Sequence, residues 1–184
     1  MMTQKIIILV VIIVSIVVLS SCYTSKKMST ASIPSVNDFQ LERYLGLWYE
    51  IARLPNSFEK NLDNVTANYS LKDNGEINVL NKGFNGEKKI WKDATGRAWM
   101  TDPNNPAHLR VSFFWIFSSD YKIIALDSEN YSYALVTSTS KKYLWILSRT
   151  PKMDDGIYAS LVKIANDYDF EVEKLYKVDQ SKNM

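Results

Sequence analysis

Short runs of alternating apolar and polar residues, separated by turn signals, fill residues 47–147 of the chain. Residues 65–71 alternate at period two, the pattern of a strand with one buried face. Asp73-Asn74-Gly75 follows, and Asn-Gly pairs favour tight hairpin turns because both residues tolerate positive φ. The predicted strands are 47–54, 65–71, 77–81, 88–93, 97–101, 108–117, 121–127, 131–139 and 143–148. This succession predicts an all-β fold, either a sandwich or an up-and-down barrel.

One helix is expected near the C-terminus. Asp154 precedes a stretch in which apolar residues recur at helical spacing, and an Asp at this position favours capping of the first turn. The recurring apolar residues are Ile157, Leu161, Ile164, Ala165 and Tyr168. They form a single stripe, so the helix should lie with one face against the outside of the β-structure. Residues 170–178 are predicted to form a last short strand.

The first 22 residues carry the pattern of a bacterial lipoprotein signal. Residues 6–19 are Ile, Val and Leu interrupted only by Ser15, a run of signal-peptide length and short for a bilayer span. The run ends in Leu19-Ser20-Ser21-Cys22, in which small residues precede the only cysteine of the chain. We expect cleavage after Ser21, lipidation of the Cys22 thiol and acylation of the new amino group. The alternative is an uncleaved anchor helix with an incidental cysteine.

The pattern divides the chain into four parts. They are a signal peptide over residues 1–21, a lipidated flexible tether over 22–36, a barrel domain over 37–180 and a tail over 181–184. The tether is rich in Ser, Thr and Lys. Tyr23 follows the cysteine where an Asp would favour the inner membrane, so the outer membrane is expected. About 145 residues from Asn37 onward suit one domain with its own core.

The charge balance excludes some partners. The chain has 22 Lys and Arg against 20 Asp and Glu, and removal of the signal peptide takes away Lys5. Such a balanced chain is atypical of nucleic-acid-binding proteins and of proteins that bind membrane surfaces by strong electrostatic attraction. The single cysteine also means that the folded domain has no disulfide.

Three short motifs resemble those of the lipocalin family. Gly46-Leu47-Trp48 resembles its G-x-W signature, Thr101-Asp102-Pro103 its second motif, and Arg149 at a strand end its third. They occur in the family's order and spacing, and residues 67–71 and 145–147 resemble bacterial lipoprotein lipocalins and apolipoprotein D in particular. The resemblance covers about residues 39–178. It implies an eight-stranded antiparallel up-and-down barrel with one C-terminal α-helix packed outside.

The resemblance also implies roles for individual residues. Gly46, Trp48, Asp102 and Arg149 belong to a fold-closing set at one end of the barrel, where Arg149 is expected to lie over the indole of Trp48. The alternation in residues 65–71 points Tyr69 inward. The resemblance to apolipoprotein D places a set of side chains on the cavity wall: Tyr69, Asn81, Phe113, Tyr121 and Trp145. Alternatively, these aromatic side chains fill the barrel as core.

An apolar wall with a few polar groups suits a fatty acid or a lysophospholipid. The expected function is therefore binding of such a ligand for lipid storage or transport in the cell envelope, without a cofactor, a metal site or catalysis. An enzyme on the same barrel would have to use His108, the only histidine, or Glu50 or Asp102. His108 is better explained as an exposed loop residue.

A third reading is an envelope interaction protein that uses the barrel as a platform. Trp115, Ile116 and Phe117 are apolar residues expected near the open end of the barrel. Exposure of these side chains would favour a protein partner, membrane contact or a homodimer.

Overall fold

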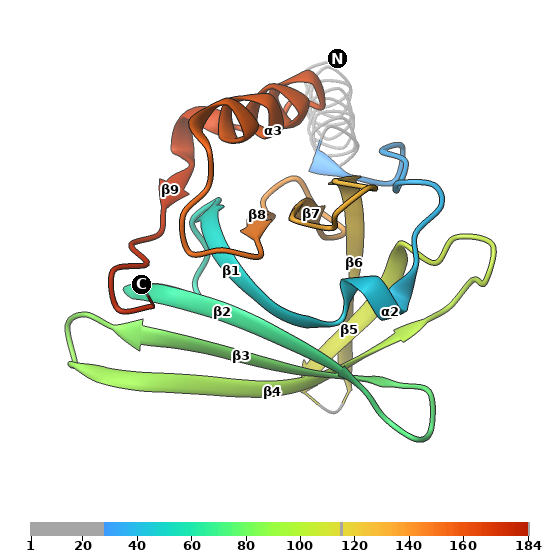
Figure 1. Ribbon diagram of the computed structural model, residues 1–184, viewed down its shortest axis with the longest axis horizontal. Helices are drawn as coiled ribbons and strands as arrows, with labels where there is room; N and C mark the ends of the chain where they lie inside the picture. Colours follow the sequence, from blue (N-terminus) through green and yellow to red (C-terminus); the bar gives the residue numbers. More distant parts are fainter. Residues whose placement is uncertain (1–27, 115, 184) are drawn as a thin grey trace, which may run out of the picture.

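The computed structural model describes residues 28–114 and 116–183, and these residues form a closed β-barrel (Figure 1). Eight antiparallel strands follow one another in chain order around the barrel. Strand β1 closes the barrel by pairing with both β2 and β8. The predicted all-β fold is therefore confirmed as an eight-stranded up-and-down barrel, and the sandwich is excluded.

The barrel strands are β1 (Gly46–Arg53), β2 (Leu62–Leu71), β3 (Ile77–Asn85), β4 (Ile90–Met100), β5 (His108–Phe114), β6 (Phe117–Leu126), β7 (Tyr133–Thr137) and β8 (Leu144–Ser148). The remaining elements are α2 (Leu41–Tyr44), α3 (Asp155–Asp167), a 3₁₀ helix η1 (Val172–Lys174) and β9 (Tyr176–Lys177), which pairs with the end of β1. None of the described helices combines the length and the apolar character that a bilayer crossing requires.

The connections between strands alternate between two ends of the barrel. Residues 72–76, 101–107 and 127–132 lie at the closed end, together with α2. Tyr44 and Trp48 have no exposed surface there. The connections at the opposite, open end are residues 54–61, 86–89, 115–116 and 138–143. Gly46 enters β1 with φ +92°, a conformation in which a side chain would be strained.

Two apolar clusters stabilise the fold. The first fills the closed half of the barrel, and the second lies between the barrel wall and α3. Asp154 caps α3, because its Oδ1 accepts hydrogen bonds from the backbone of Gly156 (2.8 Å) and Ile157 (3.1 Å). Leu161 and Ala165 are buried beneath the helix. The predicted packing of this helix against the outside of the barrel is therefore confirmed.

Two predicted strand boundaries are wrong. The separate strands 88–93 and 97–101 are one strand, β4, which pairs with β3 without interruption. The predicted strand over 170–178 contains only η1 and the two-residue β9. Gly96 does not break β4; it allows a close approach, because a Cβ there would lie 2.7 Å from the Ser112 carbonyl oxygen and from the Phe113 ring.

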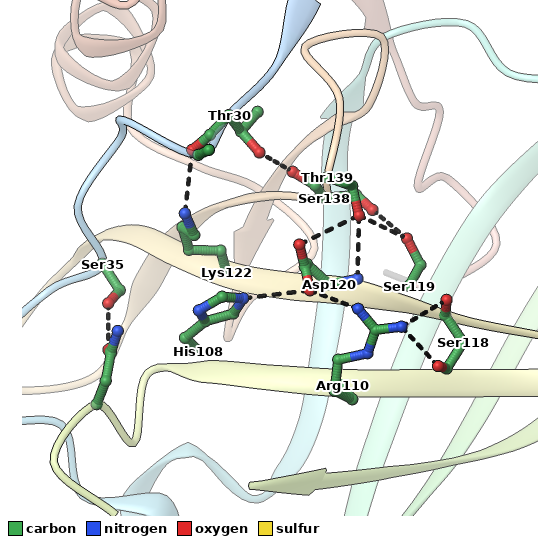
Figure 2. A network of polar contacts seen from close by, with 12 residues as sticks. Thr30, Ser35, His108, Arg110, Ser118, Ser119, Asp120, Lys122, Ser138 and Thr139 are labelled. Carbon is green, nitrogen blue, oxygen red and sulfur yellow. Dashed lines mark hydrogen bonds and ion pairs between the residues drawn. The ribbon is translucent and has the colours of Figure 1, made fainter. Parts of the chain in front are cut away.

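The predicted tether needs a similar correction. Residues 28–36, here called the N-terminal arm, pack along the outside of the barrel. The Lys122 ammonium donates to the carbonyl oxygens of Thr30 (3.0 Å) and Ile33 (2.9 Å), and Ile33 is buried. The backbone of Val36 donates to Ile123 (2.9 Å). Part of these contacts is visible in Figure 2. The folded part thus begins before residue 37, and residues 22–27 lie outside the described part.

Candidate ligand-binding cavity

A cavity of about 560 Å³ occupies the barrel. Aromatic and aliphatic side chains from seven of the strands, β2 to β8, form most of its wall, and its polar lining is sparse. The wall includes every residue predicted for it, namely Tyr69, Asn81, Phe113, Tyr121 and Trp145. The structure thus brings these residues together around one space, while their contact with a ligand remains a prediction.

Trp48 and Arg149 form the floor beneath this cavity. The Arg149 guanidinium lies over the Trp48 indole at 3.9 Å from the ring centroid. It also donates to the carbonyl oxygens of Arg43 (2.7 Å), Leu47 (2.8 Å) and Tyr131 (3.2 Å). One side chain therefore joins α2, β1 and the connection between β6 and β7.

Asp102 lies apart from this floor. Its side chain is exposed, and its Oδ1 accepts from the backbone of Asn104 at 2.9 Å. Its carbonyl oxygen accepts from Asn105 at 3.0 Å. Asp102 shapes the turn between β4 and β5 at the closed end, and it contacts neither Trp48 nor Arg149 through any hydrogen bond among the described residues.

Three buried tyrosine hydroxyls meet above the floor. The Tyr121 hydroxyl lies 2.7 Å from that of Tyr44 and 2.9 Å from that of Tyr69. Burial raises the pKa of each of the three phenols above its usual range, so all three stay protonated. Three hydroxyl protons serve two hydrogen bonds, so one donor remains for another partner.

Asn81 supplies a complementary acceptor on the cavity wall. Its side-chain Oδ1 is buried, and within the described ranges 28–114 and 116–183 it has no hydrogen-bond partner. A buried carbonyl without a partner is costly unless a bound molecule satisfies it. The largely apolar wall therefore contains one residue with an unsatisfied acceptor, Asn81, and a tyrosine group with one spare donor.

A charged cluster that the sequence analysis missed lies toward the open end. Glu50 and Glu59 line the cavity, and Arg53 lies beside them; all three are buried. Arg53 Nη1 donates to Glu50 Oε1 at 2.7 Å, and Trp145 Nε1 donates to Glu59 Oε2 at 3.1 Å. Burial and the nearby Glu59 carboxyl raise the pKa of Glu50 well above its usual range, against the opposing effect of Arg53. Glu50 lies two residues after Trp48 in β1, so alternation in the sequence could have predicted that both side chains point into the barrel.

An aromatic group borders the mouth of the cavity. Tyr143 and Trp145 stack with ring centroids 6.1 Å apart, and Phe58 from the connection between β1 and β2 lies 5.9 Å from Tyr143. Phe58 is 62% exposed. An acyl chain entering the barrel would therefore pass beside these rings.

His108 belongs to a polar network on the barrel wall, which Figure 2 shows. Its Nε2 lies 3.3 Å from Asp120 Oδ1, to which Arg110 also donates at 2.8 Å. Although burial acts against it, these hydrogen bonds lower the pKa of Asp120 below its usual range. No serine hydroxyl donates to His108 among the described residues, and in that part of the chain no cluster of His, Cys, Asp and Glu suits a metal ion. The arrangement does not form a Ser-His-Asp site.

The closed barrel, its outer helix and the Trp48–Arg149 floor agree with the comparison to known sequences. The Lipocalin-like domain family matches residues 39–180. The chain is a member of the lipocalin family. The outer membrane lipoprotein Blc of Citrobacter freundii is 50% identical over 145 residues, which cover 79% of this chain and 81% of that protein. Apolipoprotein D of Bos taurus is 36% identical over 153 residues, covering 80% of each chain.

A solved lipocalin structure supports the same fold. Insecticyanin from the tobacco hornworm Manduca sexta superposes with a TM-score of 0.66 at 20% identity, covering 83% of this chain and 86% of that chain. The resemblance predicted from the three motifs is therefore confirmed. Lipocalins as a family bind small hydrophobic molecules and are generally not catalysts. The predicted lipidation site, Cys22, lies outside the described residues.

Proposed function

We propose that this lipocalin is a lipoprotein of the cell outer membrane that holds a fatty acid or a lysophospholipid for lipid storage or transport in the envelope. The observation that carries the proposal is the cavity of about 560 Å³ with its largely aromatic and aliphatic wall. Its volume falls within the roughly 300–1,000 Å³ of small-molecule sites. Transfer of an acyl chain from water into such a wall is favourable by about 25 cal/mol per Å² of apolar surface.

The polar groups of the cavity support a ligand with one polar end. A spare tyrosine proton and the Asn81 carbonyl oxygen together match a group that both accepts and donates, such as a protonated carboxyl or a hydroxyl. Apart from a few charged and polar side chains such as Glu50 and Glu59, the remaining wall is apolar and suits the chain of the ligand.

Lipidation of Cys22 supports the placement in the membrane. Cys22 is the only cysteine, it follows a signal-like apolar run, and a relative that is 50% identical is named an outer membrane lipoprotein. More than one acyl chain on a single residue gives stable anchoring. Mass spectrometry of the mature protein should find a diacylglyceryl group at an N-terminal Cys22, and an unmodified chain starting at Met1 would contradict it.

Tryptophan fluorescence tests ligand binding directly. Titration with a fatty acid or a lysophospholipid should change the emission of Trp145 saturably, and Trp145→Ala should weaken binding. Trp99 is the matched control, because it is not part of the cavity wall and lies beside the Arg97 guanidinium. No saturable change in a folded sample with any lipid class would overturn the proposal.

Two further measurements narrow the function. Mass spectrometry of lipid extracted from protein purified from its native membrane identifies the ligand class. Because His108 lies in the polar network with Asp120, His108→Ala should leave ligand binding unchanged. An activity lost specifically in that variant would instead favour an enzyme.

A further inference from the structure

The N-terminal arm begins at the open end of the barrel. The backbone of Lys141 donates to the Met28 carbonyl oxygen at 2.7 Å, and Ser29 forms a β-bridge with Ser140. Lys141 and Ser140 belong to the connection between β7 and β8, which is one of the open-end connections. The chain before Met28 therefore joins the barrel beside the mouth of the cavity.

The distance in sequence to Cys22 limits where a lipid anchor on that residue can lie. Five residues separate Cys22 from Met28. Fully extended, this stretch spans about 20 Å. The ten residues of β6 span about 33 Å from the open toward the closed end. A lipid on Cys22 thus keeps the membrane nearer to the open end than to the closed end.

The most exposed large apolar side chains lie at this same end. Phe114 is 74% exposed, Ile116 82% and Phe117 71%, and Phe58, in another open-end connection, is 62% exposed. These four residues are here called the apolar rim. Leu71, the most exposed large apolar side chain at the closed end, is 50% exposed. An apolar group of this kind on one face indicates an interaction surface.

Charge distinguishes the two ends as well. The open-end connections carry five lysines against two glutamates, one of which, Glu59, is buried. The exposed lysines are Lys60, Lys88, Lys89 and Lys142, whereas the fifth, Lys141, is largely buried and pairs with Asp169 at 3.4 Å. The closed-end connections carry one lysine against five acids, which are Asp73, Glu76, Asp102, Asp127 and Glu129. Lysines near an anionic lipid surface are attracted to it, whereas carboxylates are repelled.

We propose that the open end docks onto the anionic lipid bilayer in which Cys22 is anchored, with the apolar rim inserted and the lysines at the head groups. This inference rests on the proposed lipid anchor. The docked barrel presents its mouth to the bilayer, so that a lipid passes between membrane and cavity without crossing water. The exit point of the chain, the apolar rim and the charge distribution each point to the same end.

Site-specific fluorescence on the full, lipidated chain tests the docking. Ile116→Cys carries an environment-sensitive dye at the rim, and Asp73→Cys carries it at an exposed turn of the closed end. Acylated Cys22 has no free thiol and does not react with the dye. In vesicles of phosphatidylethanolamine and phosphatidylglycerol with nitroxide-labelled lipid, we expect a blue shift and severalfold greater quenching at residue 116 than at 73. Vesicles of phosphatidylcholine alone should reduce the quenching at residue 116.

The outcomes separate the docking from the anchor. Protein that floats with the vesicles but shows equal quenching at both positions, or none at residue 116, overturns the docking and leaves the anchor intact. Protein that does not float with the vesicles contradicts both. Stronger quenching at residue 73 would place the closed end on the membrane and also overturn the docking.

Lipid uptake gives a functional readout. Ile116 belongs to the rim but does not line the cavity. Ile116→Asp should slow uptake of a fluorescent fatty acid from vesicles severalfold and leave the Kd for the dispersed fatty acid unchanged. Leu71→Asp places the same change at the closed end and should alter neither. Equal uptake rates in the two variants, or a weaker Kd in Ile116→Asp, would contradict docking by the rim.

Discussion

Arg149 shows how one side chain holds the closed end together. Its guanidinium lies over the Trp48 ring and donates to carbonyl oxygens of three separate segments. Only Leu45 separates α2 from β1, whereas Tyr131 lies far away in the chain, so the contacts fix α2 and the start of β1 against the connection between β6 and β7. The sequence motif identified the residue, and the three carbonyl acceptors explain why an arginine, with several donors in one plane, occupies it.

Arg149→Met should lower the free energy of unfolding by about 2–3 kcal/mol, because it removes charge-assisted hydrogen bonds and a cation–π contact. Urea denaturation measures the change. Arg97→Met is the matched control: Arg97 lies 4.9 Å from the Trp99 centroid and pairs with Glu76 at the surface. The Arg97→Met variant should lower the free energy of unfolding by at most about 1 kcal/mol. Equal losses in the two variants would argue against a special role for Arg149.

Glu50 predicts an unusual dependence of stability on pH. Its raised pKa means that the folded protein retains a proton that the unfolded chain releases above about pH 4.3. Stability from this group is therefore present at low pH and is lost as the pH rises toward the folded-state pKa. The difference in unfolding free energy between the native protein and Glu50→Gln should fall as pH rises from 4.

Glu76 offers a control of opposite sign. The hydrogen bond from Arg97 lowers the pKa of this exposed carboxyl. Stability from Glu76 is therefore gained as pH rises and lost as pH falls through the folded-state pKa. The difference in unfolding free energy between the native protein and Glu76→Gln should thus increase from pH 2 to 5. Parallel pH profiles for Glu50→Gln and Glu76→Gln in denaturation measurements would refute the assignment of Glu50.

At the scale of the strands, β4 packs so closely against β5 that position 96 requires a glycine. A Cβ at this position would lie 2.7 Å from the Phe113 ring and the Ser112 carbonyl oxygen. Gly96→Ala should cost about 1–3 kcal/mol through overpacking and should weaken ligand binding, because Phe113 lies on the cavity wall. A Cβ at Gly86 meets no atom within 4 Å, so Gly86→Ala should change neither quantity. Thermal unfolding and fluorescence titration measure the two effects.

The Lys122 ammonium group contributes to the attachment of the N-terminal arm to the barrel. Lys122→Met leaves the carbonyl oxygens of Thr30 and Ile33 without their donor, which should cost about 1–3 kcal/mol. Amide hydrogen exchange should also accelerate over residues 30–36. Lys142→Met, at an exposed lysine, provides the control. Unchanged exchange in Lys122→Met would show that the packing of Ile33 and the backbone hydrogen bonds of the arm hold it without the ammonium group.

Alternation in the sequence predicts on which face of a strand a side chain lies only where the pairing register with the neighbouring strand is continuous. Strict alternation would place Tyr121, Ile123 and Ala125 on one face of β6, and Tyr121 and Ile123 do contribute to the inner cluster. The register between β6 and β7 shifts between Ile123 and Ala125. Ile124 and Ala125 both join the cluster beneath α3 as a result. A bulge of this kind leaves no clear signal in the local sequence.

At the scale of the whole molecule, ligand binding should stabilise the barrel. A fatty acid at 100 times its Kd should raise the free energy of unfolding by about 2.7 kcal/mol if it binds only the folded state. Denaturation with and without the ligand measures this. Trp145→Ala should require a higher fatty acid concentration for the same shift, and Trp99→Ala should not. Stabilisation that is independent of Trp145 would place the ligand elsewhere.

The sequence by itself determined the all-β class, and its resemblance to the lipocalins implied the barrel and five residues of the cavity wall. Turn signals and alternation act between neighbours in the chain, so local patterns were sufficient for the strands, and the three motifs, which occupy fixed points of the fold, were sufficient for the family. Only the tertiary structure decided the Glu50–Arg53–Glu59 cluster and the attachment of the N-terminal arm to Lys122. The Lys122 contacts and the hydrogen bond from Trp145 to Glu59 join segments far apart in the chain. The members of the charged cluster are close in sequence, but their burial exists only once the barrel has closed, and their energies depend on that burial.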